Sequence, residues 1–184
     1  MSELQDTLGT GNLVALGTFL ALWLVIEIII DHSPLRFRSL SMQMAFKRRE
    51  WMLVMADRDL RMIDTSILAG LQQGAAFFGS ASLLGIGGCF ALLGATDNVV
   101  QIHRDLPLEA EFTRGLWETK VLGLTAIFGY SFFKFGWSYR LFNYCSIIIG
   151  SVQHKDDASQ EERRKPALQA AEINTIAARH FTAG

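Results

Sequence analysis

The fold is decided by residues 67–95, which read ILAGLQQGAAFFGSASLLGIGGCFALLGA. This stretch contains no Asp, Glu, Lys or Arg. A helix needs about 20 mostly apolar residues to cross the hydrocarbon core of a bilayer, where its backbone must satisfy its own hydrogen bonds. Because residues 67–95 exceed that length, we expect one transmembrane helix here that tilts or protrudes from the bilayer.

Two further apolar stretches lie on either side of it in the chain. Residues 13–30 have Glu27 as their only ionisable side chain, and residues 121–139 contain only Lys134. The apolar pattern of the later stretch continues to residue 149, so we expect that helix to extend past the membrane surface. The sequence therefore predicts an all-α fold, a single helical membrane domain over residues 1–184 with three transmembrane helices.

The positions of Lys and Arg predict the orientation in a bacterial inner membrane. The tail before residue 13 has none, whereas the loop over residues 32–65 has seven and residues 152–184 have five. The loop over residues 96–119 has only Arg104 and Arg114 and is rich in acidic residues. Since basic loops stay in the cytoplasm, the N-terminus is expected outside, and the first loop and the C-terminal tail inside.

Residues 40–63 contain no Pro or Gly and predict a long helix with an apolar surface that includes five methionines. Lys47, Arg48 and Arg49 give this helix a basic patch. Apolar side chains beside clustered cations are typical of a helix at the bilayer interface, where anionic lipid headgroups lie. The alternative is a helix that packs on the rest of the protein. Asp57 and Arg61 are four residues apart and predict a surface ion pair on this helix.

Polar side chains within the apolar stretches are candidates for function because ionisable groups in a bilayer are costly. Glu27, Gln72, Gln73 and Lys134 each lie several residues inside the expected cytoplasmic boundary. They form a candidate polar layer that would line an ion or solute path. The structural alternative is a neutralised pair, or a Lys134 side chain that extends to the interface.

Small residues recur at about four-residue spacing along residues 67–95. The glycines that carry this pattern are Gly70, Gly74, Gly79, Gly85 and Gly88. Small residues at this spacing let two membrane helices approach closely. The pattern predicts tight helix packing, either within the chain or between copies of it.

Other signals point away from catalysis and cofactors. The net charge of −1 gives no reason to expect a nucleic-acid partner. Cys89 and Cys145 both lie in apolar sequence and predict buried thiols rather than a metal site. We find no convergent set of acid, base and nucleophile, so we expect a protein that is not an enzyme and holds no cofactor.

Several short motifs together resemble a bacterial and plant membrane family known only as a domain of unknown function, number five-nine-nine. They include Trp51-Met52, Arg58-Asp59, Arg61, Asp64, Phe77-Phe78, Ser80, the stretch RLFNYC at residues 140–145 and AEIN at residues 171–174. The resemblance covers most of the chain and implies no accepted activity. It also implies a fourth membrane span after the helix that contains Asn174, which this sequence does not include.

Taken together, the sequence predicts an integral membrane protein that acts by assembly, as a homo-oligomer or as an accessory subunit of a larger inner-membrane complex. Its expected partners are membrane lipids, preferentially anionic ones, and copies of itself or other membrane subunits. The alternative function is a small channel or transporter that uses the polar layer.

Overall fold

The computed structural model describes residues 40–105 and 113–184, together with residues 11, 14–15, 17–19, 21–22 and 25. All regular elements in this part of the chain are helices. They are α2 (Leu40–Ala56), α3 (Met62–Gly94), α4 (Thr96–Asp105), α5 (Arg114–Ser151) and α6 (Gln160–Thr182). The predicted all-α fold is therefore confirmed. Most of the predicted first span, residues 13–30, lies outside the described residues.

Of the described helices, α3 alone is long and apolar enough to cross a membrane by length and composition. It matches the prediction for residues 67–95 and begins five residues earlier. The predicted span over residues 121–139 lies within α5, which continues to Ser151 as expected but does not reach the same standard. Lys134, together with Ser131 and Ser138, lowers the average hydropathy of that stretch, so a bundle of three transmembrane helices is not confirmed.

The chain divides into two compact units. One consists of Met1–Arg36 and Leu84–Phe128, and the other of Phe37–Leu83 and Gly129–Gly184. In the first unit, α4 occupies part of the stretch that the sequence predicted as a connecting loop. Arg114, at the start of α5, binds both Asp97 of α4 and Glu118 one turn further on, each at 2.8 Å. All three side chains are exposed to a large extent, so these pairs add little stability.

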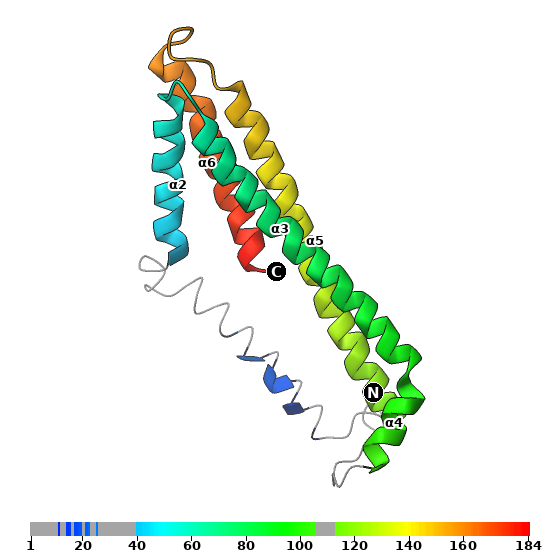
Figure 1. Cartoon of the computed structure of the whole chain (residues 1–184). Helices are drawn as coiled ribbons and strands as arrows, with labels where there is room; N and C mark the ends of the chain where they lie inside the picture. Colours follow the sequence, from blue (N-terminus) through cyan, green and yellow to red (C-terminus); the bar gives the residue numbers. More distant parts are fainter. Residues whose placement is uncertain are drawn as a thin grey trace. The chain divides into compact units, whose positions relative to one another are not determined.

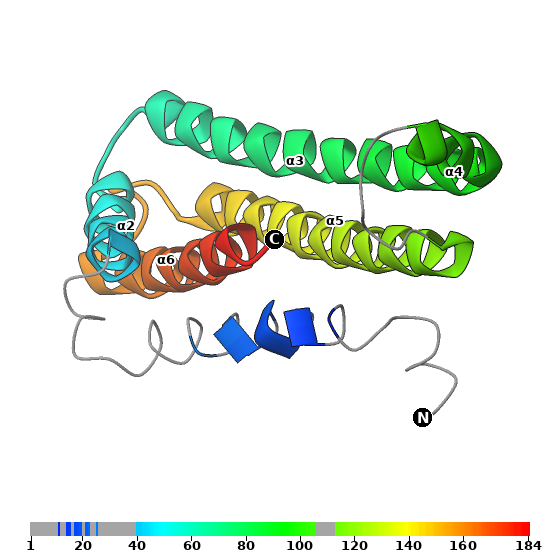
Figure 2. The same ribbon diagram turned by 90° about the horizontal axis from the view of Figure 1, so that it is seen from below.

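In the second unit, α6 lies along the second part of α5 and packs against α2 (Figures 1 and 2). A capping box starts α6: the Ser159 hydroxyl accepts from the Glu162 backbone N–H, and the Glu162 carboxylate accepts from the Ser159 backbone N–H. The helix therefore begins before Pro166, whereas the sequence predicted that it would follow this residue. Its buried face consists mainly of alanines, which allow helices to approach closely; these are Ala167, Ala170, Ala171 and Ala177.

Large apolar side chains complete the core of this unit. Met52 and Met55 of α2, Leu68 of α3 and Phe142 of α5 are at most 2 % exposed. The methionines of α2 divide between roles, since Met52 and Met55 are buried while Met44 is 41 % exposed. One face of α2 therefore packs on the protein, which was the alternative to a helix held only at the bilayer interface.

Candidate functional site: the polar junction and the predicted polar residues

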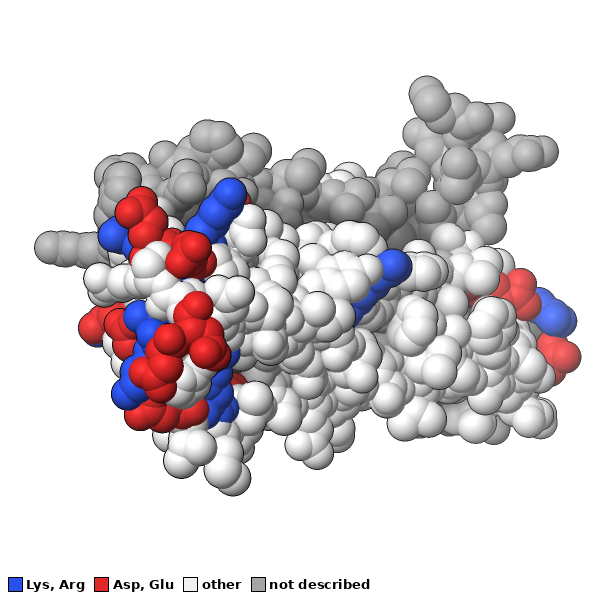
Figure 3. Space-filling model, turned by 90° about the horizontal axis from the view of Figure 1, so that it is seen from above, with Lys and Arg blue, Asp and Glu red and all other residues white. Residues whose placement is uncertain are grey.

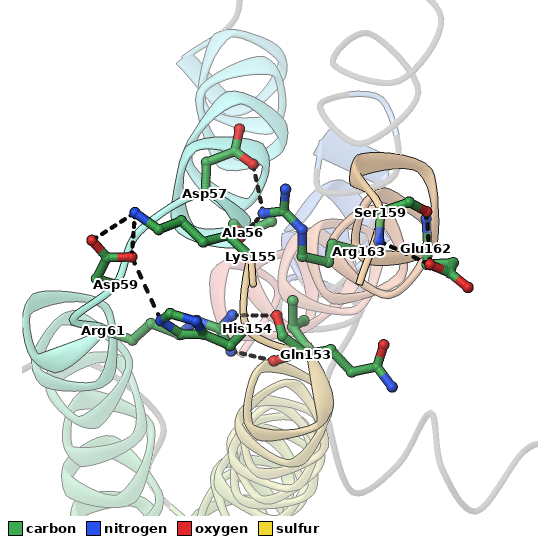
Figure 4. Close-up of polar contacts among 11 residues, drawn as sticks. Ala56, Asp57, Asp59, Arg61, Gln153, His154, Lys155, Ser159, Glu162 and Arg163 are labelled. Carbon is green, nitrogen blue, oxygen red and sulfur yellow. Dashed lines mark hydrogen bonds and ion pairs between the residues drawn. The ribbon is translucent and has the colours of Figure 1, made fainter. Parts of the chain in front are cut away.

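The connections of the second unit meet in a polar junction, formed by the loop between α2 and α3, the segment between α5 and α6, and the first turn of α6 (Figure 4). In the view of Figure 3, charged side chains gather at this end of the unit. The predicted helix over residues 40–63 ends at Ala56, because residues 57–61 turn away to make contacts in this junction.

Arg61 binds the end of α5. Its guanidinium donates from Nη1 to the carbonyls of Ile149, at 3.2 Å, and Val152, at 2.5 Å. Its Nη2 donates to the carbonyl of Gln153 at 3.0 Å (Figure 4). Carbonyls at the end of a helix lack intrahelical donors and carry partial negative charge. Arg61 satisfies both needs and fixes the start of α3 to the end of α5.

Arg163 plays the same part for α2. Its Nη1 donates to the carbonyl of Ala56, the last residue of α2, at 2.6 Å and to Oδ1 of Asp57 at 2.7 Å. The side chain is only 9 % exposed, although it is charged. The predicted ion pair between Asp57 and Arg61 is therefore wrong: each binds elsewhere, because the helix that would have placed them on one face has already ended.

A second set of charges joins the two connections at the surface. Lys155 Nζ lies 2.7 Å from Oδ1 of Asp59 and 2.9 Å from its Oδ2, and His154 Nε2 lies 3.5 Å from Oδ1. The hydrogen bond from Lys155, with the nearby positive charges, holds the pKa of the Asp59 carboxyl below its usual value. The same bond raises the pKa of the Lys155 ammonium.

Asp64 is the buried member of the junction. Its Oδ1 accepts from Trp51 Nε1 at 2.7 Å and from Arg58 Nη1 at 2.6 Å, and the residue is fully buried. A carboxylate in the first turn of a helix is also stabilised by the helix dipole, and Asp64 occupies that place in α3. The junction as a whole joins helix ends to one another. Its one pairing of a hydroxyl with a carboxylate, Ser159 with Glu162 at 2.7 Å, belongs to the capping box of α6.

The candidate polar layer is distributed differently from the prediction. Gln72 of α3 donates from Nε2 to Asn143 Oδ1 at 3.0 Å and to Ser146 Oγ at 2.9 Å, both on α5. The sequence missed Asn143 and Ser146 as partners, because pairing between helices depends on their register. Gln73 is exposed. Glu27 lies outside the described residues.

Lys134 does not share the level of Gln72. It precedes Asn143 by nine residues in α5, about 14 Å at 1.5 Å per residue. It lies instead near Gly79, since a Cβ on Gly79 would be 3.7 Å from the Cβ of Phe135. The Lys134 ammonium is 5.6 Å from the ring centroid of Tyr130, a cation–π arrangement. The described members of the proposed layer therefore lie at two depths.

The basic patch also separates into different environments. Lys47 pairs with Glu50 at 2.7 Å, and both side chains are well exposed. Arg48 is half-buried, and burial lowers its pKa. Arg49 lines a groove between α2 and α6. Consecutive helical residues point in directions about 100° apart, which explains why three neighbours in sequence do not share one surface.

The glycines of α3 divide between used and unused packing positions. A Cβ on Gly85 would lie 2.9 Å from ring atoms of Phe128, and Gly79 faces Phe135, so these two glycines pack against α5. Around Gly70, Gly74 and Gly88, no described residue comes within 4 Å of an added Cβ, apart from the helix's own backbone. The described residues of one chain therefore occupy only part of the predicted ridge.

Two buried groups on facing helices, Asn174 and Cys145, form a contact that the sequence did not predict. Asn174 of α6 is fully buried, and its Nδ2 lies 3.7 Å from Cys145 Sγ of α5. The thiol donates to the carbonyl of Ala170 at 3.4 Å. Burial raises the pKa of the Cys145 thiol to about 11, so it is a structural thiol, as the sequence predicted.

These features define the class as an α-helical protein whose described residues include one helix long and apolar enough to cross a membrane, with arginine caps at the ends of α2 and α5. Within that class, the chain belongs to the family described as protein of unknown function DUF599, whose model matches residues 14–184. The resemblance noted from the sequence is therefore confirmed. No curated protein and no solved structure matches the chain.

Proposed function

We propose that this is an integral membrane protein that acts by assembly, as a homo-oligomer or as an accessory subunit of an inner-membrane complex, and that it is not an enzyme. The observation that carries the proposal is the exposed apolar surface of α3. Only 17 % of its most apolar 18-residue window is buried. Phe77 is 67 % exposed and Leu84 is 77 % exposed.

Such a surface is unfavourable in water, since monomeric soluble proteins rarely expose large contiguous apolar patches. Lipid tails can cover most of it. The glycines offer a reason for part of it to meet another helix, because the helix axes of two chains approach closely where no side chain intervenes. Gly70 and Gly74 have that spacing, and among the described residues nothing outside their own helix lies within 4 Å of an added Cβ.

The topology proposed with this function keeps the N-terminus outside and the junction and α6 in the cytoplasm. The five Lys and Arg side chains in residues 152–184 support this orientation through the positive-inside rule. The channel alternative has less support from the geometry. Gln72 already uses its amide within the chain, and Lys134 lies about 14 Å further along α5.

The test is the mass of the native assembly, extracted gently with its lipids. A single repeated mass is expected for a homo-oligomer, and additional chains are expected for an accessory subunit. Replacing both Gly70 and Gly74 with Leu should shift the assembly toward the monomer. Gly123→Leu on α5 is the control, since Gly123 also has nothing within 4 Å of an added Cβ.

A wild-type chain that is monomeric and free of other chains under these conditions would contradict assembly. A chain that is released from membranes by alkaline carbonate would contradict membrane integration. If the control variant dissociates as much as the Gly70/Gly74 variant, the glycine pair is not the contact.

A further inference from the structure

A groove of about 440 Å³ lies between α2 and α6. The two helices are close where Arg163 binds Ala56, and they diverge toward the beginning of α2 and the end of α6 (Figures 1 and 2). Ala45 and Arg49 line the groove from α2. Leu168, Ile176 and Arg179 are among the residues that line it from α6.

The groove combines apolar side chains with two exposed arginines, Arg49 and Arg179. Arg49 and Arg179 are exposed, and neither forms an ion pair in the part of the chain that the structure describes. Glu172 also lines the groove, without an ion pair to either arginine. An anionic group bound between the two arginines would complete the charge balance, and an attached apolar chain would suit the walls.

The position of α6 along α5 places this groove at the level of a headgroup region. Ser138 donates to the carbonyl of Ala177 and Ser131 to the carbonyl of Gly184, so the end of α6 lies beside residues 131–138. Because α6 exposes Glu172 and Arg179, that level cannot be the lipid-facing centre of a bilayer. The bonds from Ser138 to Ala177 and from Cys145 to Ala170 instead place the groove near residue 139 of α5, where the predicted span ends.

Positive charge gathers at that level. A Cβ on Gly184 would lie 3.2 Å from the Cβ of Lys134, so Lys134 lies beside the segment that follows α6. Burial and then the nearby Lys134 ammonium lower the pKa of His180. Arg179 is the neighbour of His180 in α6. Cations at the cytoplasmic surface attract the anionic lipids of that leaflet.

We propose that the groove between α2 and α6 binds the phosphate of an anionic phospholipid through Arg49 and Arg179, with its apolar portion against Leu168 and Ile176. The inference rests on the proposed membrane location. Of the three basic residues that the sequence grouped as one patch, only Arg49 would bind the phosphate, and Arg179 of α6 would bind it from the other side of the groove.

The experiment measures retention of phosphatidylglycerol and of phosphatidylcholine by the full chain in mild detergent, using native mass spectrometry. We expect the wild type to prefer phosphatidylglycerol. The double variant Arg49→Gln/Arg179→Gln should bind it roughly thirtyfold more weakly, since each of the two basic contacts with an anionic lipid contributes on the order of 1 kcal/mol and about 1.4 kcal/mol corresponds to a factor of ten. Arg164→Gln/Lys165→Gln removes two exposed cations of α6 that lie outside the groove and should leave the preference unchanged.

A second variant keeps the test decisive if the double variant does not fold. Glu172→Gln removes the one carboxylate of the groove and should increase retention of phosphatidylglycerol. Equal losses in the double variant and in its control would overturn the proposal in favour of diffuse surface charge. Displacement of the lipid by millimolar inorganic phosphate would overturn it in favour of a soluble anion.

Carbonate extraction of the same variants separates this inference from the proposed function. Variants that remain in the membrane but lose no lipid preference would contradict the groove alone. Release of the wild type by carbonate would contradict the membrane location on which the groove depends.

Discussion

Helix α6 is rich in charged residues but packs closely on its unit, whereas α3 is almost entirely apolar but largely exposed. The first turn of α6 contains Glu161 and Glu162, and Arg163 follows, yet the helix buries a face of alanines against the rest of its unit. α3 has no charged residue after Asp64, yet most of its apolar surface is exposed. In water the hydrophobic effect would favour burial of α3 before that of α6.

The two helices therefore suit different surroundings: α6 suits the interior of its unit, and α3 suits lipid or another chain. α6 is held by close contact, by the caps at its beginning, and by hydrogen bonds such as that from Ser138 to Ala177. α3 contributes Leu68 and Ala75 to the core of the second unit but leaves its other apolar faces for lipid or for another chain. Burial within one chain therefore does not follow hydrophobicity along this sequence.

The largest effect should come from a charge placed on the exposed surface of α3. Leu84→Arg should raise the apparent free energy of membrane insertion of α3 by about 3 kcal/mol, since an arginine near the centre of a transmembrane helix costs that much. The measurement is the ratio of inserted to non-inserted chains, read from glycosylation sites on either side of the helix.

Leu60→Arg is the matched control for that experiment. Leu60 is 76 % exposed, against 77 % for Leu84, but it lies in the loop between α2 and α3. It should change insertion little. If both substitutions had the same small effect, α3 would be in water, where surface substitutions usually change stability by less than about 0.5 kcal/mol.

A smaller effect is expected from enlarging the alanine face of α6. Ala170 is fully buried, and its carbonyl accepts from Cys145. Ala170→Leu should lower the free energy of unfolding by about 2 kcal/mol, because added carbons in a close-packed contact force neighbouring helices apart. Thermal unfolding in detergent, followed by tryptophan fluorescence, measures the loss. Gln169→Leu, at an exposed neighbour, should leave stability nearly unchanged, and equal stability of both variants would show that α6 does not pack tightly.

The local pattern of the sequence was sufficient to predict the helices that depend on it. The absence of charge in residues 67–95 indicated α3, and the apolar pattern past residue 139 indicated the length of α5. The end of α2 was missed, because Ala56 is capped by Arg163, 107 residues later in the chain. Nothing in the sequence around Ala56 predicts that contact.

The candidate residues were less predictable, because their partners depend on helix register. Gln72 was correctly identified as a polar position, but its bonds to Asn143 and Ser146 follow from the antiparallel pairing of α3 with α5. The same pairing places Lys134 at the level of Gly79. The basic triplet was read as one patch, whereas only Arg49 meets α6 at the groove.

The smallest effect concerns the surface charges of the junction, which belong neither to the alanine face nor to the apolar surface of α3. The hydrogen bond from Lys155 lowers the pKa of Asp59. A carboxyl whose pKa is lower in the folded than in the unfolded state stabilises the fold above its unfolded pKa of about 4. That contribution is lost as the pH falls through the still lower folded pKa.

Asp59→Asn should therefore lower the unfolding temperature slightly at pH 7, and the difference from the wild type should shrink as the pH falls below about 4. Because the pair also raises the pKa of Lys155, the difference should shrink again at strongly alkaline pH, as the ammonium loses its proton. Glu161→Gln serves as the control, since Glu161 is exposed and forms no ion pair in the described part of the chain. A difference that stays constant over the whole pH range would mean that Asp59 acts through its shape or hydrogen bonds and not through its charge. The effect on stability should remain below those of the two helix substitutions, since the pair is exposed to solvent.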